Sequence, residues 1–307
     1  MNTPLTDLIA APVAADEIDE LGHLSVPFYE RRAIDACHKL ADSHGLNIAD
    51  CRSRGIEFTL VDAYLRNLRE QFLGAPLLVR GGVLSVSEHR LRCYQELINT
   101  DNGDLSAAFV YDFELQRSTS REPLPLPEHV VHSAAAEIIS LPPHGAPRSI
   151  DLAIMPAIPE LNRLQRLNLA LTQPHSIEAE ECDETGLYRA EQFLHLPYRG
   201  ERVEDPVAQW VFETSDGKKL GMADLESRQL LFNLPRVNEQ IQTFRAEVEI
   251  ASKTFYGNHW VYSLDSGRLL SIASLVSVAL DLDARRAVEI PAEMRAALQA
   301  RCYQELR

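Results

Sequence analysis

The chain has 307 residues and a formal net charge of −15 at pH 7. Its composition, 45% hydrophobic and 24% charged, is typical of a soluble globular protein of about two domains. The acidity argues against a nucleic-acid-binding protein, because phosphate binding uses clustered Lys and Arg. Five scattered cysteines argue against a disulfide framework, and the longest apolar run, residues 269–280, is too short for a membrane span. No basic region precedes the first apolar stretch, so we expect no signal peptide and a cytoplasmic protein without a nucleic-acid or membrane partner.

The first half predicts one helix followed by an antiparallel meander. Pro27 suits the first turn of a helix, and Gly45 suits its left-handed end. Between them, four apolar residues share one helical face, which predicts a helix over residues 26–44: Ile34, Cys37, Leu40 and Ala41. Strand-like runs follow at residues 56–64, 77–86 and 91–98, and residues 105–115 place an apolar side chain at every second position. This is an α+β pattern, in which the helix packs on one face of a sheet.

The second half repeats the strands more faithfully than the helix. Residues 244–250 alternate in polarity, and residues 269–280 read as a buried strand. Pro197 and Gly200 interrupt the segment that corresponds to the first helix, so a helical stretch is expected over residues 205–213 instead. The proline-rich residues 141–160 are predicted to link a domain at residues 1–140 to a domain at residues 161–307.

A repeat with a spacing of 164 residues relates the two halves. Three groups of residues recur at this spacing: Asp19, Glu20 and Gly22 at Asp183, Glu184 and Gly186; Asp101, Gly103 and Leu105 at Asp265, Gly267 and Leu269; and Pro127 at Pro291. We infer a duplicated unit whose copies bury a shared surface. His23 and Tyr29 correspond to Leu187 and Phe193, so function is expected to differ between the halves.

The pattern Asp19-x-x-Gly22-His23, with Tyr29 six residues later, stands immediately before the predicted helix. It places a carboxylate and an imidazole at a helix N-terminus, whose free N–H groups stabilise developing negative charge. Acyl transfer requires this combination. An Asp before a helix is often only a cap; we prefer that interpretation for Asp183 and the catalytic one for Asp19. Tyr29 fits the core and a pocket equally well.

This motif resembles the 4-hydroxybenzoyl-CoA thioesterase-like branch of the hot-dog superfamily, whose members carry Asp-x-x-Gly-His before a central helix. Further residues are similar to the betainyl-CoA thioesterase domain fused to some carnitine dehydrogenases: Phe58-Thr59, Leu68-x-Glu70, Gly74, and the prolines Pro123, Pro125 and Pro127. The resemblance covers residues 15–130 and, more weakly, residues 175–295.

The resemblance implies a double hot-dog, with two antiparallel sheets each wrapped around a helix and forming an intrachain pseudo-dimer. It implies hydrolysis of a small- or medium-chain acyl-CoA thioester, with no cofactor beyond the coenzyme A of the substrate. Asp19 would act as nucleophile or general base, with Gly22 and His23 completing the catalytic set. Tyr29 and Ser25 would bind substrate, although many relatives have asparagine where Ser25 stands. A homodimer of double hot-dog chains would fit the same family.

Two other functions stay open. A hydratase or dehydratase can use the same fold, but its Asp-x-Asn-x-x-His pattern is absent from the sequence. A non-catalytic acyl-CoA-binding or regulatory protein would be favoured if Asp19 were buried and fully occupied by capping bonds.

Other residue patterns exclude several chemistries. No metal is expected, since the spacing of Cys37, His38, His44 and Cys51 matches no common zinc site. No phosphate loop or G-x-S-x-G motif occurs. The pairs Trp260/Tyr262 and Phe255/Tyr256 are predicted in the core or an interface rather than in an aromatic cage for a quaternary ammonium.

Overall fold

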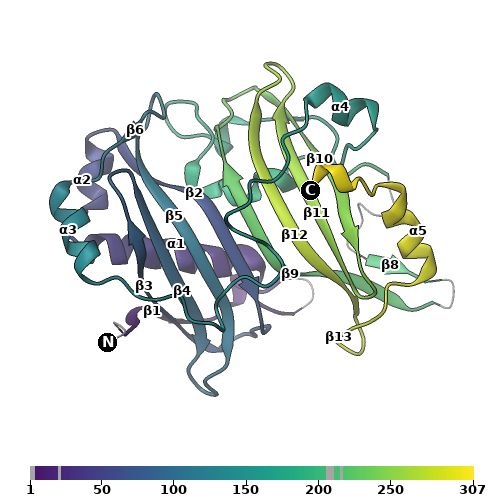
Figure 1. Ribbon diagram of the computed structural model, residues 1–307, viewed down its shortest axis with the longest axis horizontal. Helices are drawn as coiled ribbons and strands as arrows, with labels where there is room; N and C mark the ends of the chain where they lie inside the picture. The colour runs from purple at the N-terminus through teal and green to yellow at the C-terminus, as the bar shows by residue number, and fades with distance from the viewer. Residues whose placement is uncertain (1–3, 20–21, 205–210, 215–216) are drawn as a thin grey trace. The chain divides into compact units, whose positions relative to one another are not determined.

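The computed structural model describes residues 4–19, 22–204, 211–214 and 217–307. The chain divides into unit 1, residues 1–146, and unit 2, residues 147–307. Each unit contains an antiparallel sheet and a few helices, which is the predicted α+β class (Figure 1). Among the described residues, none of the helices has the length and apolar character needed to cross a membrane.

Unit 1 contains five main strands. In chain order its elements are β1 (Thr6–Pro12), η1 (Ala15–Glu17), α1 (Val26–Ser43), α2 (Ile48–Ser53), β2 (Ile56–Asn67), β3 (Pro76–Val86), β4 (Arg90–Asn99), β5 (Leu105–Arg117), β6 (Pro123–Leu124) and α3 (Glu128–Ala136). Its strands are antiparallel in the order β1-β3-β4-β5-β2, and β6 pairs with β5. The predicted helix and the four predicted strands are confirmed, whereas β1, α2 and α3 were not predicted.

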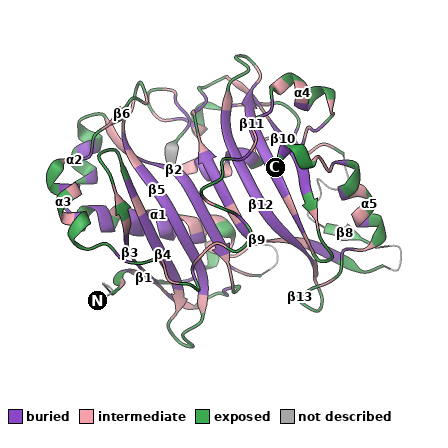
Figure 2. Ribbon diagram, viewed as in Figure 1, coloured by how far each residue is buried: buried purple, intermediate pink, exposed green. Residues whose placement is uncertain are grey.

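Helix α1 crosses one face of this sheet because its apolar face is buried there (Figures 1 and 2). Every member of the predicted helical face is buried: Ile34, Cys37, Leu40 and Ala41. Opposite them, β5 presents Phe109, Tyr111 and Phe113, and β4 presents Gln95, whose amide donates to Cys37 Sγ at 3.0 Å. The alternation along β5 therefore sorts its side chains between the face under α1 and the opposite face.

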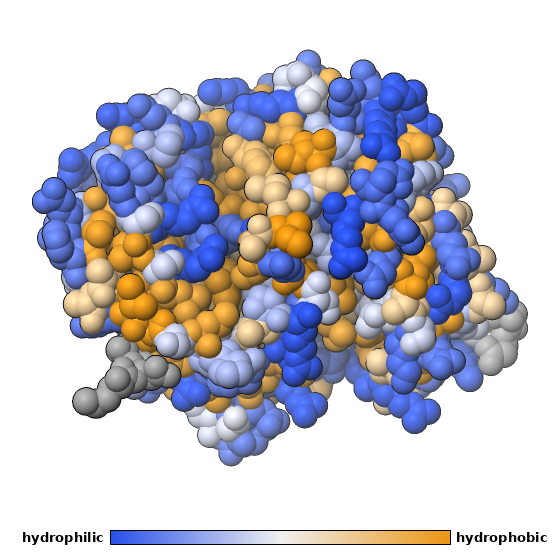
Figure 3. Space-filling view, viewed as in Figure 1, coloured by the Kyte–Doolittle hydropathy of each residue, from blue (hydrophilic) through white to orange (hydrophobic). Residues whose placement is uncertain are grey.

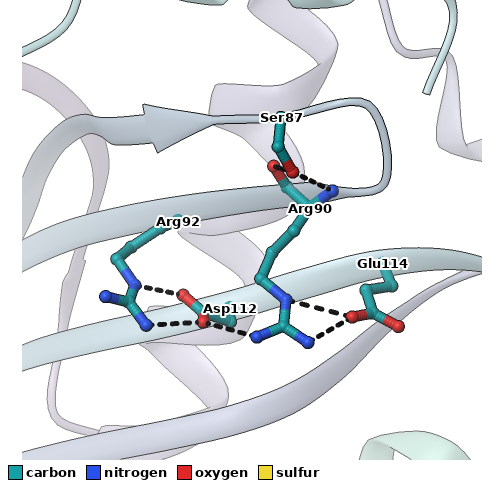
Figure 4. Close-up of polar contacts among 5 residues, drawn as sticks. All are labelled: Ser87, Arg90, Arg92, Asp112 and Glu114. Carbon is teal, nitrogen blue, oxygen red and sulfur yellow. Dashed lines mark hydrogen bonds and ion pairs between the residues drawn. The ribbon is translucent and has the colours of Figure 1, made fainter. Parts of the chain in front are cut away.

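The opposite face of β4 and β5 carries a group of charged side chains. Arg92 Nε lies 2.6 Å from Asp112 Oδ1, and Arg90 donates to both Asp112 and Glu114 (Figure 4). The pairs stand directly across the two strands, so they add cross-strand attraction to the sheet. The space-filling view shows polar and apolar side chains at the surface, with an apolar area over β3 of unit 1 (Figure 3).

Unit 2 repeats the antiparallel sheet of unit 1. Its elements are α4 (Leu161–Arg166), β7 (His175–Ser176), η2 (Ala179–Glu181), η3 (Ala190–Tyr198), β8 (Val211–Glu213), β9 (Lys219–Leu231), β10 (Gln240–Ile250), β11 (Thr254–Ser263), β12 (Leu269–Asp281), β13 (Arg286–Ala287), α5 (Ala292–Ala300) and η5 (Gln304–Leu306). Its strand order is β9-β12-β11-β10-β7, with β13 on β12 and β8 on β9. The strands predicted at residues 244–250 and 269–280 are confirmed. Trp260 and Tyr262 lie in a buried core cluster, as predicted.

The duplication extends to the details of the backbone. The pairs β3/β10, β4/β11, β5/β12 and α3/α5 each begin and end 164 residues apart. The bulge between Val83 and Ser85 recurs between Glu247 and Glu249. Because a bulge is an irregularity of one particular strand pair, its recurrence at the repeat spacing shows that both units descend from one pattern.

The central helix is the element that differs. At the place of α1, unit 2 has the 3-10 helix η3, which includes Pro197 and ends before Gly200 at φ +91°. Proline removes a backbone donor, and a positive φ leaves the helical region, so the segment cannot continue as an α-helix. The helix expected over residues 205–213 is wrong at its end, since Val211–Glu213 forms β8; residues 205–210 lie outside the described residues.

The proline-rich segment is held by each unit separately. In unit 1, Arg66 Nη1 donates to the carbonyls of His144 and Ala146 at 2.8 and 3.2 Å. In unit 2, Glu226 Oε2 accepts the N–H groups of residues 148–150 at 3.2 to 3.3 Å. The unit boundary between Ala146 and Pro147 falls inside this segment.

Candidate active site

Asp19 and His23 close a tight turn that ends shortly before α1. The N–H of Gly22 donates to the Asp19 carbonyl at 3.0 Å, and the N–H of Asp19 donates to the His23 carbonyl at 2.9 Å. Gly22 has φ +83°, a conformation that side-chain-bearing residues rarely adopt. The glycine of the motif thus lets the chain reverse and bring the two side chains together. Glu20 lies outside the described residues.

The His23 ring lies between two carboxylates. Its Nδ1 is 3.0 Å from Asp19 Oδ2, and its Nε2 is 3.7 Å from Glu70 Oε1. The N–H of His23 donates to Asp19 Oδ1 at 3.3 Å. The side chains of Asp19, His23 and Glu70 are 29%, 17% and 41% exposed. This is a line of acid, imidazole and acid that stays open to solvent, and such a line can move protons.

The loop after β2 carries Glu70 to this place. The N–H of Leu24 donates to the Gln71 carbonyl at 2.7 Å, and the Tyr29 hydroxyl donates to the Arg69 carbonyl at 3.2 Å. Burial raises the pKa of Tyr29, so its hydroxyl stays protonated and remains a donor. Tyr29 is therefore buried and acts in this structure as a support for the loop. Glu70 is one of the residues that carry the family resemblance. The sequence did not predict its contact with His23, because the two residues share no local motif.

The turn leads directly into α1. The N-cap residue of α1 is Ser25, which has an extended backbone and whose side chain makes no capping hydrogen bond. Asp19 therefore does not occupy the N-cap position of this helix. The first N–H groups of any α-helix lack partners inside the helix and carry partial positive charge. Arg32, inside α1, pairs with Glu17 at 2.6 Å and ties the helix to η1 ahead of the turn. Asp19, Gly22, His23 and Ser25 thus gather at one helix N-terminus.

Residues 13–133 match the family profile of the Thioesterase-like superfamily. The matched segment lies within unit 1. A search of the curated proteins finds no match.

Solved structures of thioesterases resemble this chain over most of its length. A putative oleoyl thioesterase from Lactobacillus plantarum has a TM-score of 0.65 at 11% identity, covering 91% of this chain and 98% of its own. The 12:0-ACP thioesterase from Umbellularia californica has a TM-score of 0.66 at 10% identity, covering 90% and 94%. An acyl-ACP thioesterase from Bacteroides thetaiotaomicron has a TM-score of 0.61 at 10% identity, covering 89% and 97%. At these identities the likeness establishes the fold, which is the predicted hot-dog.

The second copy of the motif keeps the turn and lacks the acid–imidazole pair. Asp183 Oδ1 accepts the N–H and hydroxyl of Thr185 at 2.8 and 2.7 Å and the N–H of Leu187 at 3.2 Å. The position that corresponds to Glu70 is Leu234. Asp183 thus caps its own turn. In the part of the chain that the structure describes, no three His, Cys, Asp or Glu side chains gather as a metal site.

Proposed function

We propose that this thioesterase-like chain hydrolyses a small- or medium-chain acyl-CoA thioester to the free acid and CoA, with Asp19 as nucleophile or general base. The observation that carries the proposal is the contact of the Asp19 carboxylate with the His23 imidazole at the N-terminus of α1. It lies inside the segment that matches the thioesterase-like superfamily.

The geometry supports two routes to the same products. As a nucleophile, Asp19 would attack the thioester carbonyl, expel the CoA thiolate and leave a mixed anhydride that water then hydrolyses. As a general base, Asp19 would take a proton from a water whose oxygen bonds to the thioester carbonyl carbon, and collapse of that adduct would break the C–S bond and expel the CoA thiolate. In both routes the carbonyl oxygen gains negative charge, which the first N–H groups of α1 would stabilise. His23 would orient the Asp19 carboxylate, and Glu70 would orient the ring of His23 from its other nitrogen.

The main rival is a non-catalytic acyl-CoA-binding protein. That function would suit a buried Asp19 whose oxygens were fully used by capping bonds. Asp19 instead keeps 29% of its side chain exposed and faces an imidazole, whereas Asp183 receives three capping bonds on one oxygen. This contrast favours hydrolysis in unit 1. Because two solved structures of similar fold are named as ACP thioesterases, acyl-ACP is the second substrate class to test.

The deciding experiment is a hydrolysis screen on the full chain. Acyl-CoAs from acetyl to lauroyl, and lauroyl-ACP, are supplied, and thiol release is followed with a chromogenic disulfide. Cys302 is partly exposed, so a reaction without substrate corrects for protein thiols. We expect release from at least one acyl-CoA and a loss on the order of a hundredfold or more in Asp19→Asn, whose amide keeps the shape but not the charge.

The matched control is Asp183→Asn, the same change at the same place of the second copy, which should leave turnover nearly unchanged. Turnover at the wild-type rate by a folded Asp19→Asn protein would contradict the assignment. Equal losses in the two variants would show that both copies take part in catalysis.

A further inference from the structure

Unit 2 carries buried charge on the sheet face that unit 1 covers with α1. In unit 1 this face includes Gly81, Val83, Cys93, Gln95 and Phe113; at the repeat spacing of 164 residues unit 2 has Arg245, Glu247, Gly257, His259 and Ser277. The opposite face of the unit 2 sheet keeps an ordinary apolar core. The replacement of neutral by charged residues is therefore confined to one face. Decay of an unused site would not by itself explain it, because buried charges are costly to retain.

Arg245 and His259 stand directly opposite each other on β10 and β11. They are 7% and 3% exposed. Arg245 Nε donates to Glu247 Oε1 at 2.7 Å, while its two terminal nitrogens make no hydrogen bond to a described residue. Neither ring nitrogen of His259 has a hydrogen-bond partner in the described part of the chain. Buried polar groups are normally satisfied, so the two unpartnered ring nitrogens of His259 point to a ligand.

The Glu247 carboxylate lies over a glycine of the neighbouring strand. A Cβ atom on Gly257 would lie 2.7 Å from Glu247 Oε2, closer than atoms can approach. The first copy has Cys93 at this position. Glu247 is fully buried, and its Oε2 also lacks a partner among the described residues. The absence of a side chain at Gly257 thus leaves room for the Glu247 carboxylate in its present position.

Guanidinium groups surround His259. Burial lowers the pKa of His259, and the guanidinium groups of Arg245, Arg202 and Arg301 lower it further, so the ring is neutral. Burial raises the pKa of the two carboxyl groups near these arginines, those of Glu247 and Asp224. An anionic ligand at this face would therefore meet positive charge.

We propose that this face of β10 and β11 binds a small organic carboxylate between the terminal nitrogens of Arg245 and the ring of His259. The planar guanidinium fork matches the two oxygens of a carboxylate, and a neutral imidazole supplies one further N–H. Tyr198, whose ring packs edge-on against His259 at 6.3 Å between centroids, is 39% exposed. The cluster therefore lies one side chain from solvent. The proposal does not depend on thioester hydrolysis in unit 1.

Isothermal titration of the full chain tests the site. Sodium acetate, sodium butyrate and inorganic phosphate are titrated at constant ionic strength set with chloride. We expect saturable binding of a carboxylate and no comparable binding of phosphate. His259→Gln, which installs the residue of the first copy, and the double variant Arg245→Gln/Glu247→Gln, which leaves no lone charge of that pair, should each weaken binding on the order of tenfold or more.

Crystals of the unaltered protein soaked in butyrate provide a second test that does not depend on the folding of a variant. Density that bridges Arg245 and His259 supports the site. Absence of that density, preferential binding of phosphate, or carboxylate affinity that is unchanged in both folded variants would each overturn the proposal.

Discussion

Glu30 provides a quantitative test of the environment that α1 creates in unit 1. It is half-buried on α1 and makes no hydrogen bond or ion pair with the described residues. Burial raises the pKa of its carboxyl group to about 8. Burial also raises the pKa of Tyr111, and Glu30 raises it further, so the two groups lie near each other. Glu30→Gln keeps the size of the side chain and removes its ionisation.

The magnitude follows from the shift. A rise from 4.5 to about 8 corresponds to at most ~5 kcal/mol of folding free energy, at about 1.4 kcal/mol for each pKa unit. Because the side chain keeps some contact with water, we expect roughly 2 kcal/mol. The folded pKa lies above the unfolded one, so the stability of the protonated group is complete below 4.5 and is lost as pH rises through about 8. Glu30→Gln should therefore stabilise the protein at high pH.

Urea unfolding at about pH 5 and about pH 9 measures this effect. Both tryptophans lie in unit 2, so far-ultraviolet circular dichroism, which also reports on unit 1, is the appropriate signal. We expect the variant to gain roughly 2 kcal/mol over the wild type between the two pH values. A difference between the two proteins that does not change with pH would refute the reasoning, because the Glu30 carboxyl would then titrate alike in the folded and unfolded chain.

Three further predictions use other features of unit 1. Glu17→Gln should show the opposite pH dependence: burial alone would raise the pKa of Glu17, but the hydrogen bonds from Arg32 and the Ala14 N–H, together with the charges of Arg32 and Arg31, outweigh it and lower the pKa. The stability that Glu17 adds is present above 4.5 and lost as pH falls through the folded value, which the same unfolding series would show. Glu70→Gln should reduce kcat about tenfold and alter the pH profile of kcat, as expected for a residue that orients His23; an unchanged profile would remove Glu70 from the site. Residues 1–145 expressed alone should be insoluble or dimeric, because an isolated sheet leaves exposed edges that seek partners. Sedimentation checks this, and a soluble, fully active monomer would contradict it.

The sequence by itself determined the repeated architecture of this protein. The helix over residues 26–44 and the alternation along residues 105–115 depend on local periodicity, which follows from the geometry of a helix and a strand. Gly22 and Gly186, which the repeat places in correspondence, both have positive φ. These features need only the order of neighbouring residues, so one copy of the repeat predicted the other. The exception, the segment that corresponds to α1, carries Pro197, and local rules could say where a regular helix stops but not what replaces it.

The contacts of both candidate sites were decided only by the tertiary structure. Glu70 reaches His23 because hydrogen bonds from Leu24 and Tyr29 hold the loop after β2. Arg245 reaches His259 because β10 and β11 pair in one particular register. Periodicity places a residue on a face, but the neighbour it meets there comes from another strand or loop. The interaction of two charges depends on their distance and burial, and both quantities are set by packing among segments far apart in the chain.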